Sequence, residues 1–242
     1  MTQFQILKSL MLKYYINFFM VLFCANLMAQ NEAKIDSLTT EIRYGIRLGL
    51  DISKPIRMLI DPDYRGLELV GDYRLSRDLF LAAELGNETK KVDRDAVHFE
   101  TSGSYLKLGV DYNLYNNWEG MDNLIVVGFR YGFSQHTQTL LDYNLLNNDK
   151  YWQEDNRVIL TSPQRFEGLN GHWIELQLGI KAELLRNLYM GISIQMHRLI
   201  SDKDPKNFEN LFIPGFNKVL TNNPYGAGLN YTISYQLPIY KK

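Results

Sequence analysis

The strongest constraint on the fold is an alternation of apolar and polar residues that recurs along the chain. In residues 43–52, an apolar residue stands at every second position from Tyr44 to Ile52, with glycine or charged residues between. Successive side chains of a β-strand point to opposite faces, so this pattern predicts a strand with one apolar and one polar face. The same period recurs seven times, in residues 66–75, 78–86, 105–114, 124–134, 172–184, 187–198 and 225–239. The sequence therefore predicts an all-β chain of eight strands.

The polar faces of these strands carry charges of both signs. In a small closed barrel such residues can pair across a narrow interior, while the apolar faces contact lipid. A strand of about ten residues tilted near 40° spans roughly 25 Å, the height of the apolar band of an outer-membrane barrel. We therefore expect an interior polar network, formed by Arg47, Glu68, Asp72, Lys107, Asp111, Arg130, Glu175 and Lys181.

The connectors between the expected strands alternate between long and short. The short ones are 76–77, 115–123 and 185–186, and the long ones are 53–64, 87–103, 135–171 and 199–224. Transmembrane barrels have short periplasmic turns and longer external loops, and an even number of strands places both termini in the periplasm. The predicted fold is an eight-stranded antiparallel up-and-down transmembrane β-barrel with long external loops and short periplasmic turns.

The N-terminal segment differs from the rest of the chain. Lys8 and Lys13 precede an apolar run at 14–23, and Ala29-Gln30 follows shortly after. This order predicts a secretory signal peptide, with a retained N-terminal anchor as the alternative. We accordingly divide the chain into a signal peptide (1–29), a periplasmic segment (30–42) and the barrel (43–242), located in the cell outer membrane. The single cysteine, Cys24, lies in the signal segment, so no thiol chemistry is expected in the exported protein.

The composition excludes two broad classes. The chain has 242 residues with 26 basic and 27 acidic side chains, which gives no cationic field for binding a nucleic acid. Its 13% of aromatic residues and its net charge of −1 are not those of a disordered protein.

The chain offers few groups for catalysis or metal binding. The four histidines form no cluster with metal-site spacing, so we expect no metal and no cofactor. Ser134 and His136 share one face of a strand, as do the serine and histidine of small outer-membrane lipid-A deacylases. No orienting acid can be assigned, and this face is predicted to point inward rather than toward lipid.

The 135–171 connector is the candidate interaction region. A structureless loop of this length is functional or disordered. Its aromatic residues suit contacts with lipopolysaccharide, a surface glycan or another protein. The expected contact residues are Tyr143, Tyr151, Trp152 and Phe166.

Three stretches carry a family resemblance: residues 27–30 at the expected cleavage point, residues 72–80 across a tight turn, and the closing residues 226–237. With them the chain resembles the small outer-membrane β-barrel proteins of Bacteroidota, including poorly characterised families. The resemblance implies contact with outer-membrane lipid and lipopolysaccharide, and insertion by the barrel-assembly machinery. Lys241-Lys242 follow Tyr240, so the terminal aromatic residue common in such barrels is displaced.

We therefore expect a non-catalytic outer-membrane barrel with a structural or surface-interaction role, whose external loops form the contact surface. One alternative is a barrel-embedded lipid-modifying hydrolase. Another is a soluble secreted barrel that binds an apolar ligand, which would gather Leu48, Leu108, Leu178 and Ile233 into a common dry centre.

Overall fold

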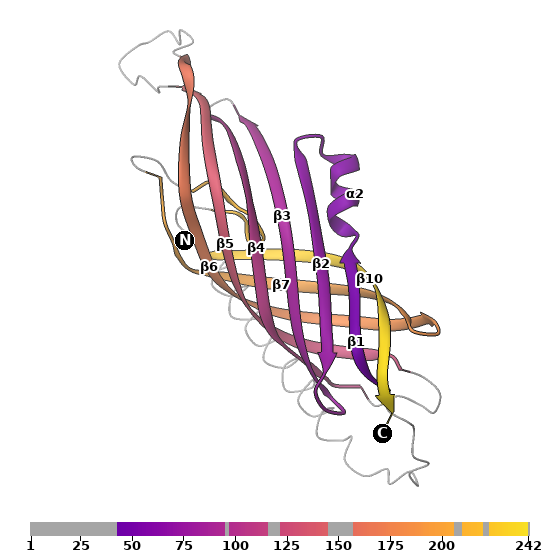
Figure 1. Cartoon of the computed structure of the whole chain (residues 1–242). Helices are drawn as coiled ribbons and strands as arrows, with labels where there is room; N and C mark the ends of the chain where they lie inside the picture. The colour runs from indigo at the N-terminus through magenta and orange to yellow at the C-terminus, as the bar shows by residue number, and fades with distance from the viewer. Residues whose placement is uncertain are drawn as a thin grey trace, which may run out of the picture. The chain divides into compact units, whose positions relative to one another are not determined.

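The computed structural model describes residues 43–94, 97–115, 122–144, 157–205, 210–219 and 223–241. The expected signal peptide and periplasmic segment lie outside these residues. Eight strands form a closed antiparallel barrel, which confirms the predicted fold class (Figure 1). They are β1 (Arg43–Asp51), β2 (Tyr64–Arg74), β3 (Leu79–Arg94), β4 (Val97–Asn113), β5 (Leu124–Asn144), β6 (Arg157–Leu185), β7 (Leu188–Asp202) and β10 (Tyr225–Lys241). Strands next to one another in this list are paired, and β10 pairs with β1 to close the ring.

The polarity of the barrel is the reverse of that in a soluble protein. Leu48, Leu108, Leu178 and Ile233 are 55%, 51%, 55% and 38% exposed, so they share no dry centre. We call the outward residues of this kind the apolar belt: Ile46, Leu48, Leu50, Leu67, Leu69, Leu81, Leu85, Leu106, Leu108, Val110, Ile125, Val127, Phe129, Leu176, Leu178, Ile180, Met190, Ile192, Ile194, Leu229, Ile233 and Leu237. The charged residues between them point inward, and most are buried, while the side chains of Asp72 and Lys181 keep 10% and 15% exposure. Strand alternation places the two sets on opposite faces of one wall.

The two ends of the barrel are distinct. The turn end carries connectors 75–78, 114–123 and 186–187, and the loop end carries all the others. Outward Asn87, Ser104 and Gln135 stand in register on three adjacent strands and are exposed. They mark the edge of the apolar belt toward the loop end.

The strands extend further than the apolar period predicts. β3 and β4 continue past the belt to Arg94 and Val97, and β5 and β6 extend to Asn144 and Arg157. The prediction of a structureless connector at 135–171 is therefore wrong for residues 135–144 and 157–171. The outward residues in these extensions are largely polar, so the hydrophobic period that located the strands stops at the belt while the backbone pairing continues.

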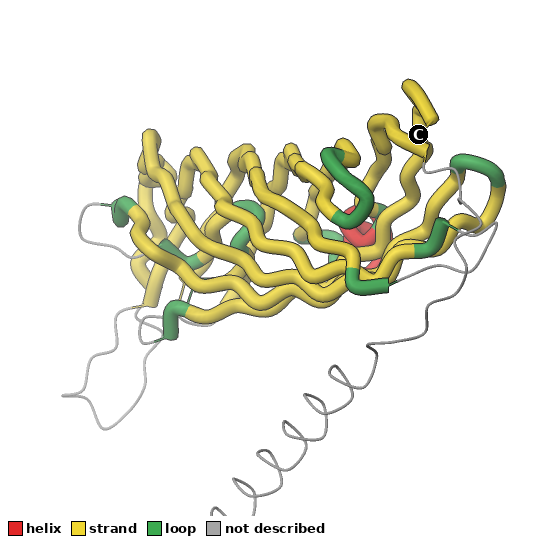
Figure 2. The backbone as a smooth tube through the Cα atoms, turned by 90° about the horizontal axis from the view of Figure 1, so that it is seen from below, coloured by secondary structure: helices red, strands yellow, loops and turns green. Residues whose placement is uncertain are grey.

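Two small elements occupy the other expected loops. Helix α2 (Ser53–Ile60) has Pro55 in its first turn, where a missing N–H costs no helical hydrogen bond. Strands β8 (Phe212–Ile213) and β9 (Asn217–Lys218) form a hairpin whose turn contains Gly215 at φ +82°. Figure 2 shows α2 in red against the yellow strands of the barrel. No helix among the described residues is long and apolar enough to cross a membrane.

Hydrophobic contacts hold the β8–β9 hairpin inside the loop end of the barrel. Ile213 and Phe216 are buried against Tyr105 and Trp173, which point inward from β4 and β6. Phe212 packs on the other side against Tyr64 and Phe99. The hairpin is therefore an internal plug of the barrel mouth rather than a surface loop.

Candidate functional site

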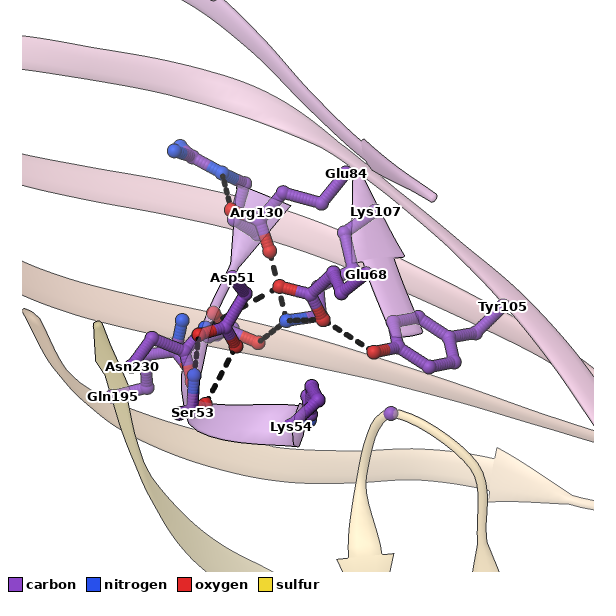
Figure 3. Close-up of polar contacts among 12 residues, drawn as sticks. Asp51, Ser53, Lys54, Glu68, Glu84, Tyr105, Lys107, Arg130, Gln195 and Asn230 are labelled. Carbon is purple, nitrogen blue, oxygen red and sulfur yellow. Dashed lines mark hydrogen bonds and ion pairs between the residues drawn. The ribbon is translucent and has the colours of Figure 1, made fainter. Parts of the chain in front are cut away.

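Buried ion pairs fill the barrel interior toward its turn end. Lys107 Nζ lies 2.8 Å from Glu84 and 3.6 Å from both Glu68 and Glu175. Arg130 continues the network, 3.2 Å from Glu84 and 2.7 Å from Asp111. Figure 3 shows Lys107, Glu68 and Glu84 converging from neighbouring strands.

The network continues toward the turn end through two further cations. Lys181 lies 3.3 Å from Asp111 and 2.8 Å from Asp72, and Arg47 lies 2.7 Å from Asp72. The structure thus joins all eight residues of the expected polar network, and Glu84 is the link between Lys107 and Arg130. The sequence pattern does not single out Glu84, because the inward face of its strand also carries Phe80 and Ala82, which weakens the polar alternation.

Long charged and aromatic side chains pack into the turn half of the interior. A void bounded by Arg47, Asp72, Arg130 and Lys181, among others, measures only about 40 Å³. The guanidinium of Arg47 also stacks between the rings of Phe80 and Tyr189, at 4.9 and 5.0 Å from their centroids. An eight-stranded barrel is just wide enough for side chains to fill, and this half meets that expectation.

The loop half contains a cavity of about 690 Å³. Its walls come from α2, the β8–β9 hairpin, and strands β3, β4, β7 and β10. Among the described lining residues the charged side chains are all cationic: Lys54, Arg57, Lys90 and Lys107. Apolar side chains line the remainder, including Val92, Val97, Phe99, Leu211, Phe212 and Val219.

The buried carboxylate of Glu88 lies behind one wall of this cavity and binds residues that line it. Glu88 accepts hydrogen bonds from Lys54 Nζ at 2.6 Å, the Tyr64 hydroxyl at 2.7 Å and the Gly215 amide at 3.0 Å. Burial acts to raise the pKa of Glu88, but the charge of Lys54 and these hydrogen bonds outweigh it and hold the pKa below its ordinary value. One side chain thus ties α2, β2 and the hairpin to β3.

The expected catalytic pair does not form a triad. Ser134 and His136 are both buried in the barrel, and the Ser134 hydroxyl has no hydrogen-bond partner among the described residues. His136 Nε2 lies 3.2 Å from Asn210 Oδ1, and burial lowers the pKa of the imidazole. The described hydrogen-bond partner of His136 is therefore an amide and not the carboxylate that orients a catalytic histidine. The described residues also contain no group of three or more His, Cys, Asp or Glu side chains that could hold a metal ion.

Of the four aromatic residues expected to form the contact surface, the structure describes the side chain of Phe166 alone. Phe166 lies on β6, paired with Gln138 and half-buried, rather than in a loop, which corrects its expected setting. Tyr143 is in β5, and its side chain lies outside the described part of the chain. Tyr151 and Trp152 lie wholly outside it.

Comparison with known proteins gives a family without an assigned role. No curated protein matches the sequence. Among solved structures, the chain is similar to Ail, the attachment invasion locus protein of Yersinia pestis, with a TM-score of 0.42 and 7% identity. That match covers 81% of this chain and 98% of Ail. Residues 11–242 match the family described as Domain of unknown function (DUF6048), so the chain belongs to the DUF6048 family.

Proposed function

We propose that the protein is a non-catalytic outer-membrane β-barrel with a structural or surface-interaction role. The observation that carries this proposal is the reversed polarity of the wall, with the apolar belt exposed outward and the ion-pair network buried inward. A closed barrel has no unpaired strand edge across the bilayer, and an exterior apolar band is the face that lipid stabilises. An exposed apolar surface of this extent in water would drive aggregation.

The connectors support an orientation. The turn end faces the periplasm and the loop end faces outward, as in transmembrane barrels with short periplasmic turns. Residues 1–29 are the export signal, and the barrel-assembly machinery inserts the exported chain. The resemblance to barrels of Bacteroidota supports this route.

The filled turn half supports a role without conduction. An eight-stranded barrel is just wide enough for side chains to fill, and the ion-paired side chains of Arg47, Asp72 and Lys181 occupy that half. Interaction is therefore assigned to the loop end, where lipopolysaccharide, a surface glycan or another protein is the partner, and Tyr143, Tyr151, Trp152 and Phe166 are the proposed contact residues.

Membrane fractionation tests the location. We expect the full chain in the outer-membrane fraction, resistant to carbonate extraction, and migrating faster on gels when unheated than when boiled. Protease added to intact cells is expected to cleave at the loop end only. A soluble periplasmic protein without heat-modifiable migration would contradict the proposal.

A further inference from the structure

A helix takes the place of a strand in one part of the barrel wall. β1 ends at Asp51, opposite Thr232, whereas β10 continues to Tyr225. Pairing between β1 and β2 ends at Leu50 and Leu69. The chain then forms helix α2, which contacts both β2 and β10, and Figure 1 shows it beyond the arrowhead of β1, beside β2. The helix therefore stands where a longer β1 would continue the wall.

The inner face of α2 is charged and is fixed to the barrel by ion pairs and hydrogen bonds. Lys54 Nζ lies 2.6 Å from Glu88, and Arg57 donates a hydrogen bond of 3.1 Å to the β8–β9 hairpin. Asp61, which directly follows the helix, lies 2.7 Å from Lys90 of β3. Residues three and four positions apart share one side of a helix, so Lys54, Arg57 and Asp61 define the inner face. These contacts set the rotation of α2 about its axis.

The opposite face of α2 is apolar throughout. The exposed residues of the helix are Pro55, Ile56, Met58, Leu59 and Ile60. Leu59 is 87% exposed, and Ile60 is 78% exposed. An α-helix turns about 100° per residue, which places Leu59 on the side away from the charged inner face. The helix thus repeats the polarity of the barrel strands, with charged side chains inward and apolar side chains outward.

This apolar face is continuous with the apolar belt. The helix lies between β2, whose Leu67 and Leu69 belong to the belt, and β10, whose Leu229 belongs to it. The Ile52 amide donates a hydrogen bond of 2.7 Å to the Tyr231 carbonyl, so the helix begins beside the outward face of β10 that carries Leu229. A helix of eight residues is about 12 Å long. It extends the apolar surface beyond the last outward residues of β1.

The edge of β10 beside the helix gives a second reason for a helix at this place. The Tyr231 carbonyl points toward β1, and the backbone groups of alternate residues point the same way, so those of Leu229 and Ala227 face α2. No described strand pairs with them on this side. Hydrocarbon does not tolerate an open sheet edge, whereas an edge covered by protein is compatible with the bilayer. An element that covers this edge and has an apolar outer face meets both conditions.

We propose that α2 is a membrane-embedded part of the barrel wall, whose apolar face contacts the acyl chains of the outer leaflet. The inference rests on the proposed function, because that function supplies the bilayer. An interfacial helix buries its apolar face about 5–10 Å into the boundary between head groups and acyl chains, and its polar face carries basic residues. In α2 that polar face is bound to the barrel instead of to head groups. Lipid thus covers residues 53–60, which the sequence predicted as part of an external loop.

Spin labelling tests this contact in phosphatidylcholine vesicles. The full chain with Cys24→Ser has no cysteine, so Leu59→Cys, Leu108→Cys and Ser104→Cys each offer one site for a nitroxide. Collisions of the nitroxide with oxygen, which dissolves in hydrocarbon, are compared with collisions with a polar nickel chelate, which stays in water. Leu108 in the belt is the lipid reference, and outward Ser104 beyond the belt edge is the water reference. The ratio of oxygen to nickel collisions at Leu59 should exceed that at Ser104 at least about threefold, as expected for a side chain about 5–10 Å below the head groups.

The contrary outcomes are distinct. A ratio at Leu59 equal to that at Ser104, with a high ratio at Leu108, would overturn the inference and leave the barrel in the membrane. A label at Leu59 that neither reagent reaches, with spectral broadening from a second spin, would show that another copy of the chain covers α2 and would also overturn it. A low ratio at Leu108 as well would refute the membrane location itself.

Discussion

The two halves of the barrel interior differ although one alternating sequence builds both. In the turn half, long charged side chains from facing strands meet, and the void bounded by Arg47 and Lys181 measures about 40 Å³. In the loop half, β1 has ended, a helix and a hairpin replace a strand, and the cavity between them measures about 690 Å³. The comparison indicates that the turn half contributes most to stability, while the loop half is less tightly packed and contains the cavity. This division leads to predictions of different size in the two halves.

The largest effect is expected in the turn half. Arg130→Met leaves Asp111 and Glu84 each with one cation fewer in a buried setting, so it should lower the free energy of unfolding by about 3–5 kcal/mol. Urea unfolding in vesicles measures this loss. The control is Arg165→Met, whose partner Glu167 is exposed, with an expected loss below about 1 kcal/mol. Equal losses would mean that the network adds nothing beyond a surface pair.

A smaller effect is expected on the outer wall. Leu108→Arg places a charge in the apolar belt and should cost about 2–4 kcal/mol, because lipid cannot solvate it. Ser104→Arg lies on the same outward face beyond the belt edge, where the cost falls to about 0–1 kcal/mol. Unfolding in vesicles of defined thickness compares the two. If Leu108→Arg lowered the free energy of unfolding no more than Ser104→Arg does, the apolar belt would not be the surface that contacts lipid.

The third prediction concerns the hairpin in the loop half. Gly215→Ala adds a Cβ that would stand 2.6 Å from Tyr105 Cγ, at a residue with φ +82°. The left-handed conformation alone costs about 1–2 kcal/mol. Gly168→Ala carries that cost without the contact, since its φ is +68° and nothing lies within 4 Å. We expect Gly215→Ala alone to increase hydrogen exchange in the hairpin, while exchange in the turn half stays unchanged. Faster exchange throughout the barrel would show that the halves unfold together.

The smallest effect is a pH dependence confined to the loop half. The pKa of Glu88 is depressed in the folded protein, so its contribution to stability is present above the unfolded value of about 4.3 and is lost as pH falls through the lower folded value. Hydrogen exchange at the Gly215 amide, corrected for the intrinsic rate, should therefore lose protection on acidification. Glu88→Gln should abolish that dependence. If the protection of the Gly215 amide were independent of pH, the Glu88 carboxylate would not be the group that holds the hairpin in place.

The sequence predicted the membrane-height portion of each strand because an apolar face at every second residue is a local signal. It did not predict the strand extensions, since Asn87, Ser104 and Gln135 end the apolar signal while the backbone pairing continues. It did not predict α2 or the hairpin either. The residues of the ion-pair network could be predicted because they lie on the polar faces of the strands. Which of them pair with one another could not be predicted. The cavity could not be predicted, because it depends on where β1 stops relative to β10, a long-range property.

The central claim is that the apolar face of the wall contacts lipid. Reconstituting the unaltered protein with a phospholipid that carries a photoactivatable diazirine in its acyl chain, and mapping the labelled residues along 174–184 by mass spectrometry, tests it directly. The account predicts labels on Leu176, Leu178 and Ile180, alternating with unlabelled Glu175, Gln177 and Gly179. Labels on the charged set, or no label on either set, would contradict it.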